Sequence, residues 1–242
     1  MMKAIFEKKY NLRSSDFDLN GNILPQGVLE ILQDSAGRHS VSIGASVFDL
    51  DKKDLMWVVA KIRFKIINMP KMYQTVNVKT WPIKPTKIIF RRECLITDEQ
   101  GNELIRGSSE WLAVSKEKRK IVSASGIYNL AEDEYVTDIL FDEKPEKLKK
   151  FDKTAPGYVV SPKYSDIDLN GHVNNTKYAG YVVDTAFDGE NRLNYTDFQI
   201  EYRKEILKDD NIEICIKPEN GGIYAMGLNQ SGEAMFLAKL GD

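Results

Sequence analysis

Residues 164–175 read Tyr164-Ser165-Asp166-Ile167-Asp168-Leu169-Asn170-Gly171-His172-Val173-Asn174-Asn175. Three polar side chains alternate within this stretch, at Asp168, Asn170 and His172. Because alternate residues of an extended backbone point to one side, we expect a carboxylate, an amide and an imidazole to line one wall just before a helix. Such a wall would offer a reactive surface.

An earlier copy of this stretch occurs in the first half of the chain. Residues 15–22, Ser15-Asp16-Phe17-Asp18-Leu19-Asn20-Gly21-Asn22, repeat Ser165 to His172 without a gap at an offset of 150 residues (166 − 16). Asn22 stands where the second copy has His172. A repeat at this long period indicates two similar domains rather than a solenoid, whose repeats are short. We therefore interpret the chain as an internal duplication in which one copy carries the histidine.

A second correspondence lies downstream of each motif. Residues 62–66 and 202–206 share an arginine and a final isoleucine when they are aligned at an offset of 140 residues (203 − 63). This alignment sets Glu205 opposite Lys65. Glu205 then resembles His172 in being present only in the second half, and residues found in one copy alone favour a functional interpretation.

Both halves show the same order of predicted elements. In the first half, Pro25 is well placed to start a helix, and apolar or small residues recur from Val28 to Ile43 at three- and four-residue steps. His39 lies on this apolar stripe, where a packing or hydrogen-bonding role is expected. In the second half, a helix should begin near Asn174 or Asn175, either of which could cap it.

Strand-like runs follow each helix, and the short turns between them indicate antiparallel neighbours. They cover residues 57–67, 74–81, 87–97 and 103–114 in the first half, and 198–206, 211–217, 223–229 and 233–240 in the second. We place the first domain at 1–137 and the second at 157–242. A charged segment at 138–156, which contains Pro145 and Pro156, is the expected linker.

Composition narrows the class of protein. The 242 residues are 42% hydrophobic with a net charge of −2, which suits packed cores and indicates neither disorder nor general nucleic-acid affinity. The two cysteines, Cys94 and Cys215, have no CxxC spacing and are expected to be small core or surface residues. There is no zinc spacing, glycine-rich phosphate loop or GxSxG elbow, so we expect neither a metal site nor a bound cofactor.

The N-terminal sequence passes directly into strand-like sequence without the features of a signal or transit peptide. No apolar run approaches the ~20 residues that span a membrane. We therefore expect an unprocessed, cytoplasmic protein with reduced cysteines and no stable membrane insertion.

The set Asp168, Asn170, His172 and Glu205 would suit hydrolysis of an activated acyl group. Amide, imidazole or backbone N–H donors could stabilise the oxyanion, and Glu205 or His172 could deprotonate water. A thioester needs little general-acid help because a thiol has a pKa of roughly 8.5. Asp168 and Asn170 also have a structural interpretation, since Asp and Asn before a helix often satisfy backbone N–H groups.

The second motif, continued through Thr176-Lys177-Tyr178 and followed by Ile200-Glu201-Tyr202-Arg203-Lys204-Glu205, resembles that of acyl-acyl carrier protein thioesterases. Arg91-Arg92-Glu93 and residues 109–114 look like the N-terminal strands of the same family. The resemblance implies a tandem hotdog fold of α+β class, with two long helices each wrapped by a curved antiparallel sheet. It also implies a thioester hydrolase of fatty acid biosynthesis that releases free fatty acid from the phosphopantetheine thioester of acyl carrier protein and ends chain elongation.

Position by position, Asp168, Asn170, His172 and Glu205 match the family's catalytic residues. We expect attack assisted by Glu205, with Asn170 and His172 engaging the carbonyl or nucleophile and Asp168 orienting them. Plant members often have a cysteine directly after the glutamate, whereas this chain has Ile206. That difference argues against a covalent cysteine mechanism.

The resemblance also suggests substrate and partner contacts. Because acyl carrier protein is strongly acidic, we predict a docking face in the basic run of residues 79–92; without that partner the run would be a solvated strand edge. Walls of the acyl pocket are expected in the first half, although core packing is the alternative there. The predicted docking residues are Lys84, Lys87, Arg91 and Arg92, and the predicted substrate contacts are Met56, Trp57, Asn174 and Asn175.

Three other functions remain open from sequence. A hotdog thioesterase acting on coenzyme A esters would use the same residues, and a hotdog dehydratase could use histidine and a carboxylate to move protons. An acyl-binding or carrier-binding module with a degenerate site is the non-enzymatic alternative. Either a monomer or a homodimer fits the duplicated sequence.

Overall fold

The computed structural model describes residues 4–153, 155–187, 195–219 and 222–241. The chain forms two compact units: unit 1 comprises Met1–Arg13 and Glu30–Lys144, and unit 2 comprises Ser14–Leu29 and Pro145–Asp242. The boundary at 144–145 falls inside the segment predicted as a linker. The assignment of residues 14–29 to unit 2 differs from the predicted division, which placed them in the first domain.

Contacts within unit 2 explain why residues 14–29 belong there. The hydroxyl of Tyr195 donates a hydrogen bond to the carbonyl of Ile23 at 2.7 Å. Gln26 approaches Gly180 so closely that a Cβ at this glycine would lie 2.6 Å from the Gln26 amide oxygen. The residues that follow the first motif copy therefore contact residues far along the chain, a tertiary effect that local sequence patterns do not report.

The described residues of unit 1 form five antiparallel strands, the part of helix α1 from Glu30 onward, and the short helix α2. The strands lie in the order β1-β3-β4-β5-β2. Their bounds are β1 (Phe6–Asn11), β2 (Leu55–Ile66), β3 (Thr75–Pro82), β4 (Phe90–Thr97) and β5 (Glu103–Ser115). Helix α1 (Pro25–Ser42) begins at the predicted proline, whereas the short α2 (Val47–Asp51) was not predicted, although Ser46 and Asp49 form a capping box at its start.

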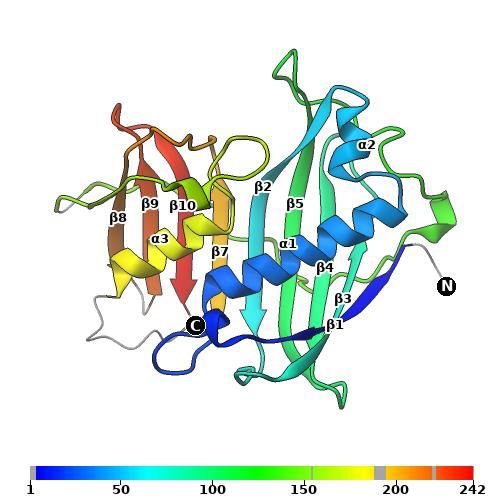
Figure 1. Cartoon of the computed structure of the whole chain (residues 1–242), viewed down its shortest axis with the longest axis horizontal. Coiled ribbons are helices and arrows are strands. Elements are labelled where there is room, and N and C mark those ends of the chain that lie inside the picture. The colour runs from blue at the N-terminus through cyan, green and yellow to red at the C-terminus, as the bar shows by residue number, and fades with distance from the viewer. Residues whose placement is uncertain (1–3, 154, 188–194, 220–221, 242) are drawn as a thin grey trace. The chain divides into compact units, whose positions relative to one another are not determined.

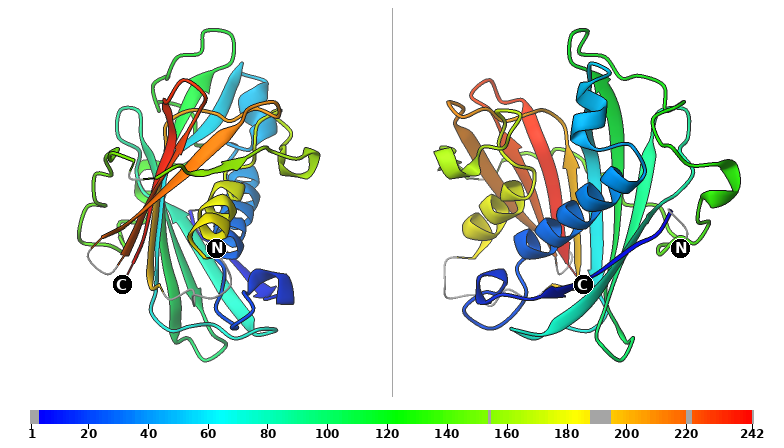
Figure 2. Two further views of the ribbon diagram at one scale, coloured as in Figure 1. Left: turned by 90° about the vertical axis from the view of Figure 1, so that its left-hand side faces the viewer. Right: turned by 45° about the vertical axis from the view of Figure 1, so that its right-hand side comes forward.

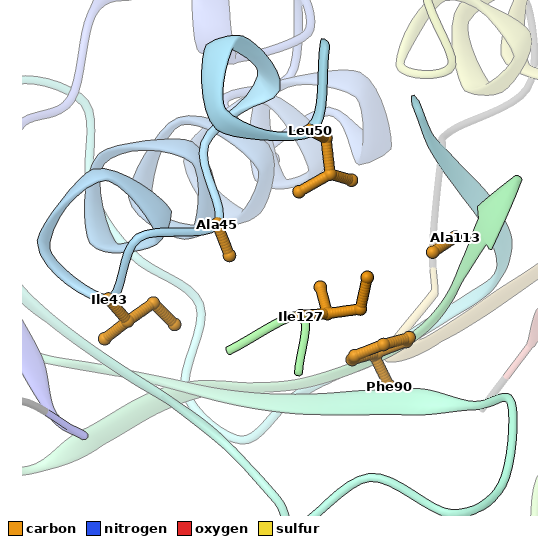
Figure 3. Packing of buried hydrophobic residues seen from close by; sticks show 6 residues of the cluster. All are labelled: Ile43, Ala45, Leu50, Phe90, Ala113 and Ile127. Carbon is orange, nitrogen blue, oxygen red and sulfur yellow. The ribbon is translucent and has the colours of Figure 1, made fainter. Parts of the chain in front are cut away.

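Helix α1 lies across one face of the unit 1 strands (Figures 1 and 2). Its predicted apolar stripe is buried, and Leu32 packs on β5 at Gly107, where a Cβ would lie 2.9 Å from a Leu32 methyl carbon. Beyond the C-terminal end of α1, six fully or almost fully buried residues converge in a hydrophobic cluster (Figure 3). They are Ile43, Ala45, Leu50, Phe90, Ala113 and Ile127.

Unit 2 repeats this arrangement with shorter elements. Its strands lie in the order β6-β8-β9-β10-β7, so that β6, β7, β8, β9 and β10 correspond in turn to β1, β2, β3, β4 and β5. Their bounds are β6 (Tyr158–Val160), β7 (Asp197–Tyr202), β8 (Ile212–Glu219), β9 (Gly222–Leu228) and β10 (Ala234–Gly241). The predicted strand 198–206 thus ends four residues early, because the chain leaves the ladder after Tyr202.

Helix α3 (Lys177–Ala186) covers one face of the unit 2 strands (Figure 1). Gly227 on β9 leaves space for the ring of Phe236 on β10, which meets the ring of Tyr178 edge to face at 5.2 Å. Leu148 joins a second buried cluster with Cys215, Met226, Leu228 and Leu237. The segment after the unit boundary therefore contributes to the core of unit 2.

Buried glutamates hold the linker to each unit. In unit 1, Glu93 is fully buried, and its carboxylate accepts the N–H of Leu140 at 3.0 Å and the Arg91 guanidinium at 2.5 Å. In unit 2, Glu201 accepts the N–H of Leu148 at 3.2 Å and the Arg203 guanidinium at 2.5 Å. The described residues of 138–156 contain neither helix nor strand, and these glutamates are among the side chains that hold the segment in place.

Among the residues that the structure describes, no helix combines the length and apolar character needed to cross a membrane.

Candidate active site

The second motif folds as a tight turn, and the expectation of an extended wall was wrong. The N–H of Asp168 donates to the carbonyl of His172 at 2.8 Å, and the N–H of Gly171 donates to the carbonyl of Asp168 at 3.1 Å. Gly171 adopts a φ of 80°, in the left-handed region that glycine enters without penalty. This reversal brings Asp168 and His172 together at the base of a hairpin rather than along one face.

The Asp168 carboxylate organises this turn from within. One of its oxygens accepts the N–H of Asn170 at 2.8 Å and the N–H of His172 at 3.3 Å. The side-chain amide of Asn170 lies 3.4 Å from the other oxygen, while the Asn170 residue itself is exposed. Asp168 therefore fixes the backbone that carries both Asn170 and His172.

The first motif copy has the same geometry. Asp18 accepts the N–H groups of Asn20 and Asn22, each at 2.8 Å, and its own N–H donates to the Asn22 carbonyl at 2.8 Å. Gly21 matches Gly171 with a φ of 81°. Asp, Asn and Gly thus build one turn in both copies, which supports the structural interpretation of the shared residues.

The two strands downstream of the motifs correspond at a different offset from the one that the sequence suggested. The N–H groups of Ile67 and Asn68 both donate to the Leu104 carbonyl, and those of Arg203 and Lys204 both donate to the Met235 carbonyl. In each unit, one carbonyl thus accepts two successive N–H groups. Matching this feature aligns the two sequences at an offset of 136 residues (203 − 67). Met69, not Lys65, is therefore the counterpart of Glu205.

The loops that follow support this alignment. The N–H of Lys71 donates to the side chain of Gln74, whose own N–H returns to the Lys71 carbonyl. Leu207 and Asp210 make the same reciprocal pair. The offset of 140 rested on an accidental identity between Arg63 and Arg203, whereas the correct register is set by ladder hydrogen bonds.

His172 and Glu205 meet beside the turn. The backbone of the second motif pairs with the segment after β7, because Val173 donates its N–H to the Ile206 carbonyl at 2.8 Å and His172 forms a β-bridge with Leu207. The imidazole Nε2 of His172 then lies 3.5 Å from a carboxylate oxygen of Glu205, and about a quarter of each side chain is accessible to solvent. The structure thus brings together two of the predicted catalytic side chains, and Asp168 accepts the backbone N–H of the histidine.

Three of the four predicted substrate contacts have partners within the protein. The Asn174 side chain accepts the N–H and hydroxyl of Thr176, each at 3.0 Å, just before α3, and the Asn175 carbonyl accepts the Tyr202 hydroxyl at 2.9 Å. Met56 is half-buried on β2. Trp57 packs edge to face on Phe90 at 4.8 Å and donates its indole N–H to the Ala45 carbonyl at 2.8 Å.

One predicted docking residue is excluded by burial. Arg92 is only 5% exposed and contacts Nδ1 of His39 at 2.8 Å, so its guanidinium is directed into unit 1 rather than toward a partner. The role expected of His39, a buried hydrogen-bonding residue, is confirmed by the same contact. Arg91 is half-buried against Glu93, Lys84 pairs with Glu132, and Lys87 is exposed.

Both cysteines are free and buried, as predicted for core residues. Burial raises the pKa of the Cys94 thiol to about 12, which disfavours the thiolate. Within the described part of the chain, no three His, Cys, Asp or Glu side chains gather in a way that could hold a metal ion.

Family models match almost the whole chain. The acyl-ACP thioesterase N-terminal domain matches residues 3–127, and the acyl-ACP thioesterase C-terminal domain matches residues 150–234. A palmitoyl-acyl carrier protein thioesterase of Cuphea hookeriana is 28% identical over 90% of this chain and 56% of its own length. The palmitoyl-acyl carrier protein thioesterase of Arabidopsis thaliana is 29% identical over 86% of this chain and 54% of its own. Both relatives are described as chloroplastic, and the chain spans just over half of their length.

Solved structures share the fold over full length. An acyl-ACP thioesterase from Bacteroides thetaiotaomicron has a TM-score of 0.86 and 21% identity, and the match covers 100% of this chain and 99% of that one. A 12:0-ACP thioesterase from Umbellularia californica has a TM-score of 0.85 and 22% identity, with 98% and 96% covered. The predicted tandem hotdog fold is confirmed, and the chain belongs to the acyl-ACP thioesterase family.

Proposed function

We propose that this protein hydrolyses acyl-acyl carrier protein thioesters to free fatty acid and holo-carrier protein, and so ends fatty acid chain elongation. The observation that carries the proposal is the pairing of His172 and Glu205, 3.5 Å apart, beside a turn that Asp168 organises. Catalytic contacts are often longer in the free enzyme than in the substrate complex, so this separation is compatible with a catalytic pair.

In the proposed reaction, Glu205 accepts a proton from water while the water oxygen bonds to the thioester carbonyl carbon. The oxyanion that forms is stabilised by N–H donors from Asn170 and His172. As the carbonyl re-forms, the carbon–sulfur bond breaks, and the phosphopantetheine thiolate leaves and takes up the proton. A thiol pKa of roughly 8.5 makes this departure easy without a strong general acid.

Asp168 acts in this scheme through the backbone. Its carboxylate accepts the N–H groups of Asn170 and His172, so it fixes where both side chains begin. The identical role of Asp18 in the copy without histidine supports positioning rather than proton transfer. We assign Asp168 as a positioning residue and Glu205, His172 and Asn170 as the groups that meet the substrate.

For the partner, we retain a docking face around Lys84, Lys87 and Arg91 and omit the buried Arg92. Reversing an exposed charge should raise KM for carrier-bound substrates while leaving kcat unchanged, because rim charges act mainly on association. Lys87→Glu is the suitable variant, because Lys87 is exposed on the loop that leads into β4. An equal rise in KM for acyl-coenzyme A would count against a protein-docking role.

The decisive experiment measures thiol release from acyl-acyl carrier proteins of graded chain length, beside matched coenzyme A thioesters. We expect the wild type to prefer the carrier-bound esters, and Glu205→Ala to lower kcat by about 10²- to 10⁴-fold, the usual contribution of a general base. Met69→Ala, at the position that corresponds to Glu205 in the other copy, is the matched control and should retain activity.

Each alternative outcome has a clear meaning. Faster release from coenzyme A esters would move the assignment to a coenzyme A thioesterase. Formation of an enoyl thioester without free thiol would identify a dehydratase, and carrier binding without turnover would identify a binding module. Undiminished thiol release by folded Glu205→Ala would overturn the catalytic assignment.

A further inference from the structure

The segment that carries Glu205 is held on both sides of the next residue, Ile206. The Ile206 carbonyl accepts the N–H of Val173, which ties the segment to the motif turn, at 2.8 Å. The Ile206 N–H donates to the hydroxyl of Tyr178 on α3 at 3.1 Å. Ile206 itself is fully buried. The position of Glu205, one residue earlier, therefore depends on two hydrogen bonds of its neighbour.

Tyr178 is itself firmly placed. It is 2% exposed, and its ring meets Tyr202 and Phe236 edge to face at 5.3 and 5.2 Å. Burial raises the pKa of its hydroxyl well above the ordinary value, so the phenol stays protonated, and a lone pair of its oxygen accepts the Ile206 N–H. The packed Tyr178 ring thus holds its hydroxyl oxygen in place as the acceptor for Ile206, which lies beyond the end of β7.

The first copy lacks both partners of this hydrogen bond. At the offset of 150 residues that relates the motifs and their helices, Val28 corresponds to Tyr178 and has no hydroxyl. At the offset of 136 that relates the following loops, Pro70 corresponds to Ile206 and has no N–H. The bond therefore occurs in the copy that also has His172 and Glu205.

We propose that Tyr178 is a positioning residue for hydrolysis, whose hydroxyl holds the Ile206 backbone and thereby sets the Glu205 carboxylate against His172. This inference rests on the proposed function, since it concerns the same site. The sequence offered one signal for it, namely a buried tyrosine in the second copy where the first has valine.

The test is Tyr178→Phe, which keeps the packed ring and removes the acceptor. We expect kcat for the preferred acyl-carrier substrate to fall about tenfold with KM unchanged, because a small displacement of a catalytic group slows chemistry more than binding. The matched control is Tyr195→Phe, which removes another buried hydroxyl in the same unit, one that bonds to the Ile23 carbonyl in the histidine-free copy. Its turnover should equal that of the wild type.

A double variant separates positioning from general loss of stability. If Tyr178 acts through Glu205, then Tyr178→Phe combined with Glu205→Ala will be no slower than Glu205→Ala alone. A further tenfold loss in the double variant would overturn the inference, as would full activity of the single variant. Should Tyr178→Phe fail to fold, 3,5-difluorotyrosine at position 178, a weaker acceptor of nearly the same shape, should lower kcat to a smaller extent.

Amide hydrogen exchange tests the contact independently of turnover. Exchange of the Ile206 amide should accelerate in Tyr178→Phe and stay unchanged in Tyr195→Phe. Unchanged exchange in Tyr178→Phe would overturn the inference even in an active enzyme. A wild type that releases no thiol would overturn the proposed function instead, while the exchange result would still decide whether Tyr178 holds this segment.

Discussion

The two motif copies share a backbone and differ in chemistry. Residues 14–24 and 164–174 make the same turn, with an aspartate that accepts two backbone N–H groups and a glycine near φ 80°. At the positions proposed to act in hydrolysis, Asn22 stands in place of His172 and Met69 in place of Glu205. Asp, Asn and Gly in this motif therefore specify a turn, and the chemistry proposed for the second copy depends on His172 and Glu205, which the first copy lacks.

Converting the second copy into the first should have a large effect on turnover. His172→Asn should lower kcat by about 10²- to 10³-fold, because in the proposed reaction the imidazole N–H stabilises the oxyanion and an amide of different reach does not reproduce that contact. The reverse change, Asn22→His, should leave turnover unchanged, since Met69 supplies no carboxylate. Thiol release from an acyl-carrier substrate measures both, and near-wild-type activity of His172→Asn would contradict the division of roles.

Replacing the two aspartates should distinguish an effect on stability from an effect on catalysis. Asp18→Ala and Asp168→Ala each remove a carboxylate that accepts two backbone N–H groups, so both should lower the free energy of unfolding by about 1–2 kcal/mol. Only Asp168→Ala should also lower kcat, by about 10²-fold, because it displaces His172 and Asn170. Urea denaturation and thiol release give the two quantities. A stability loss confined to one variant would show that the turns are not equivalent.

The sequence predicted features that depend on local periodicity. The helix from Pro25, most strands and the duplication follow from spacing and turn residues, and the structure confirms them. The sequence did not predict the tight turn, because alternating polar residues form the same pattern whether their side chains line a wall or accept hydrogen bonds from the backbone. Only the hydrogen bonds of Asp168 distinguish the two.

Long-range contacts account for the remaining errors. Arg92 was assigned to the surface because charges usually lie there, yet its partner His39 is 53 residues away in sequence and makes the buried position tolerable. Met69 was missed as the counterpart of Glu205 because sequence identity alone does not fix strand register. The sequence also does not show the contact between Tyr178 and Ile206, because it joins a helix to a segment beyond β7.

The buried glutamates extend the comparison to the linker. Glu93→Ala and Glu201→Ala each remove a buried carboxylate that accepts a linker N–H and a guanidinium, so each should destabilise its unit by about 2 kcal/mol. Because Leu148 belongs to the core of unit 2, Glu201→Ala should also speed tryptic cleavage at Lys147, Lys149 and Lys150. Glu93→Ala should leave cleavage there unchanged. Equal cleavage in both variants would show that the two attachments are not independent.

Replacing either glycine of the two turns should change stability only slightly. A Cβ at Gly21 or Gly171 would meet nothing within 4 Å, so alanine at either site tests the backbone conformation alone. Each replacement should cost about 1 kcal/mol, because an L-residue is disfavoured at positive φ, and asparagine should cost less because it tolerates that region. Thermal unfolding of the four variants checks this order. Matching losses would show that the two turns carry the same backbone constraint, whereas a larger loss at Gly171 would mean that the second copy holds strain that the first copy lacks.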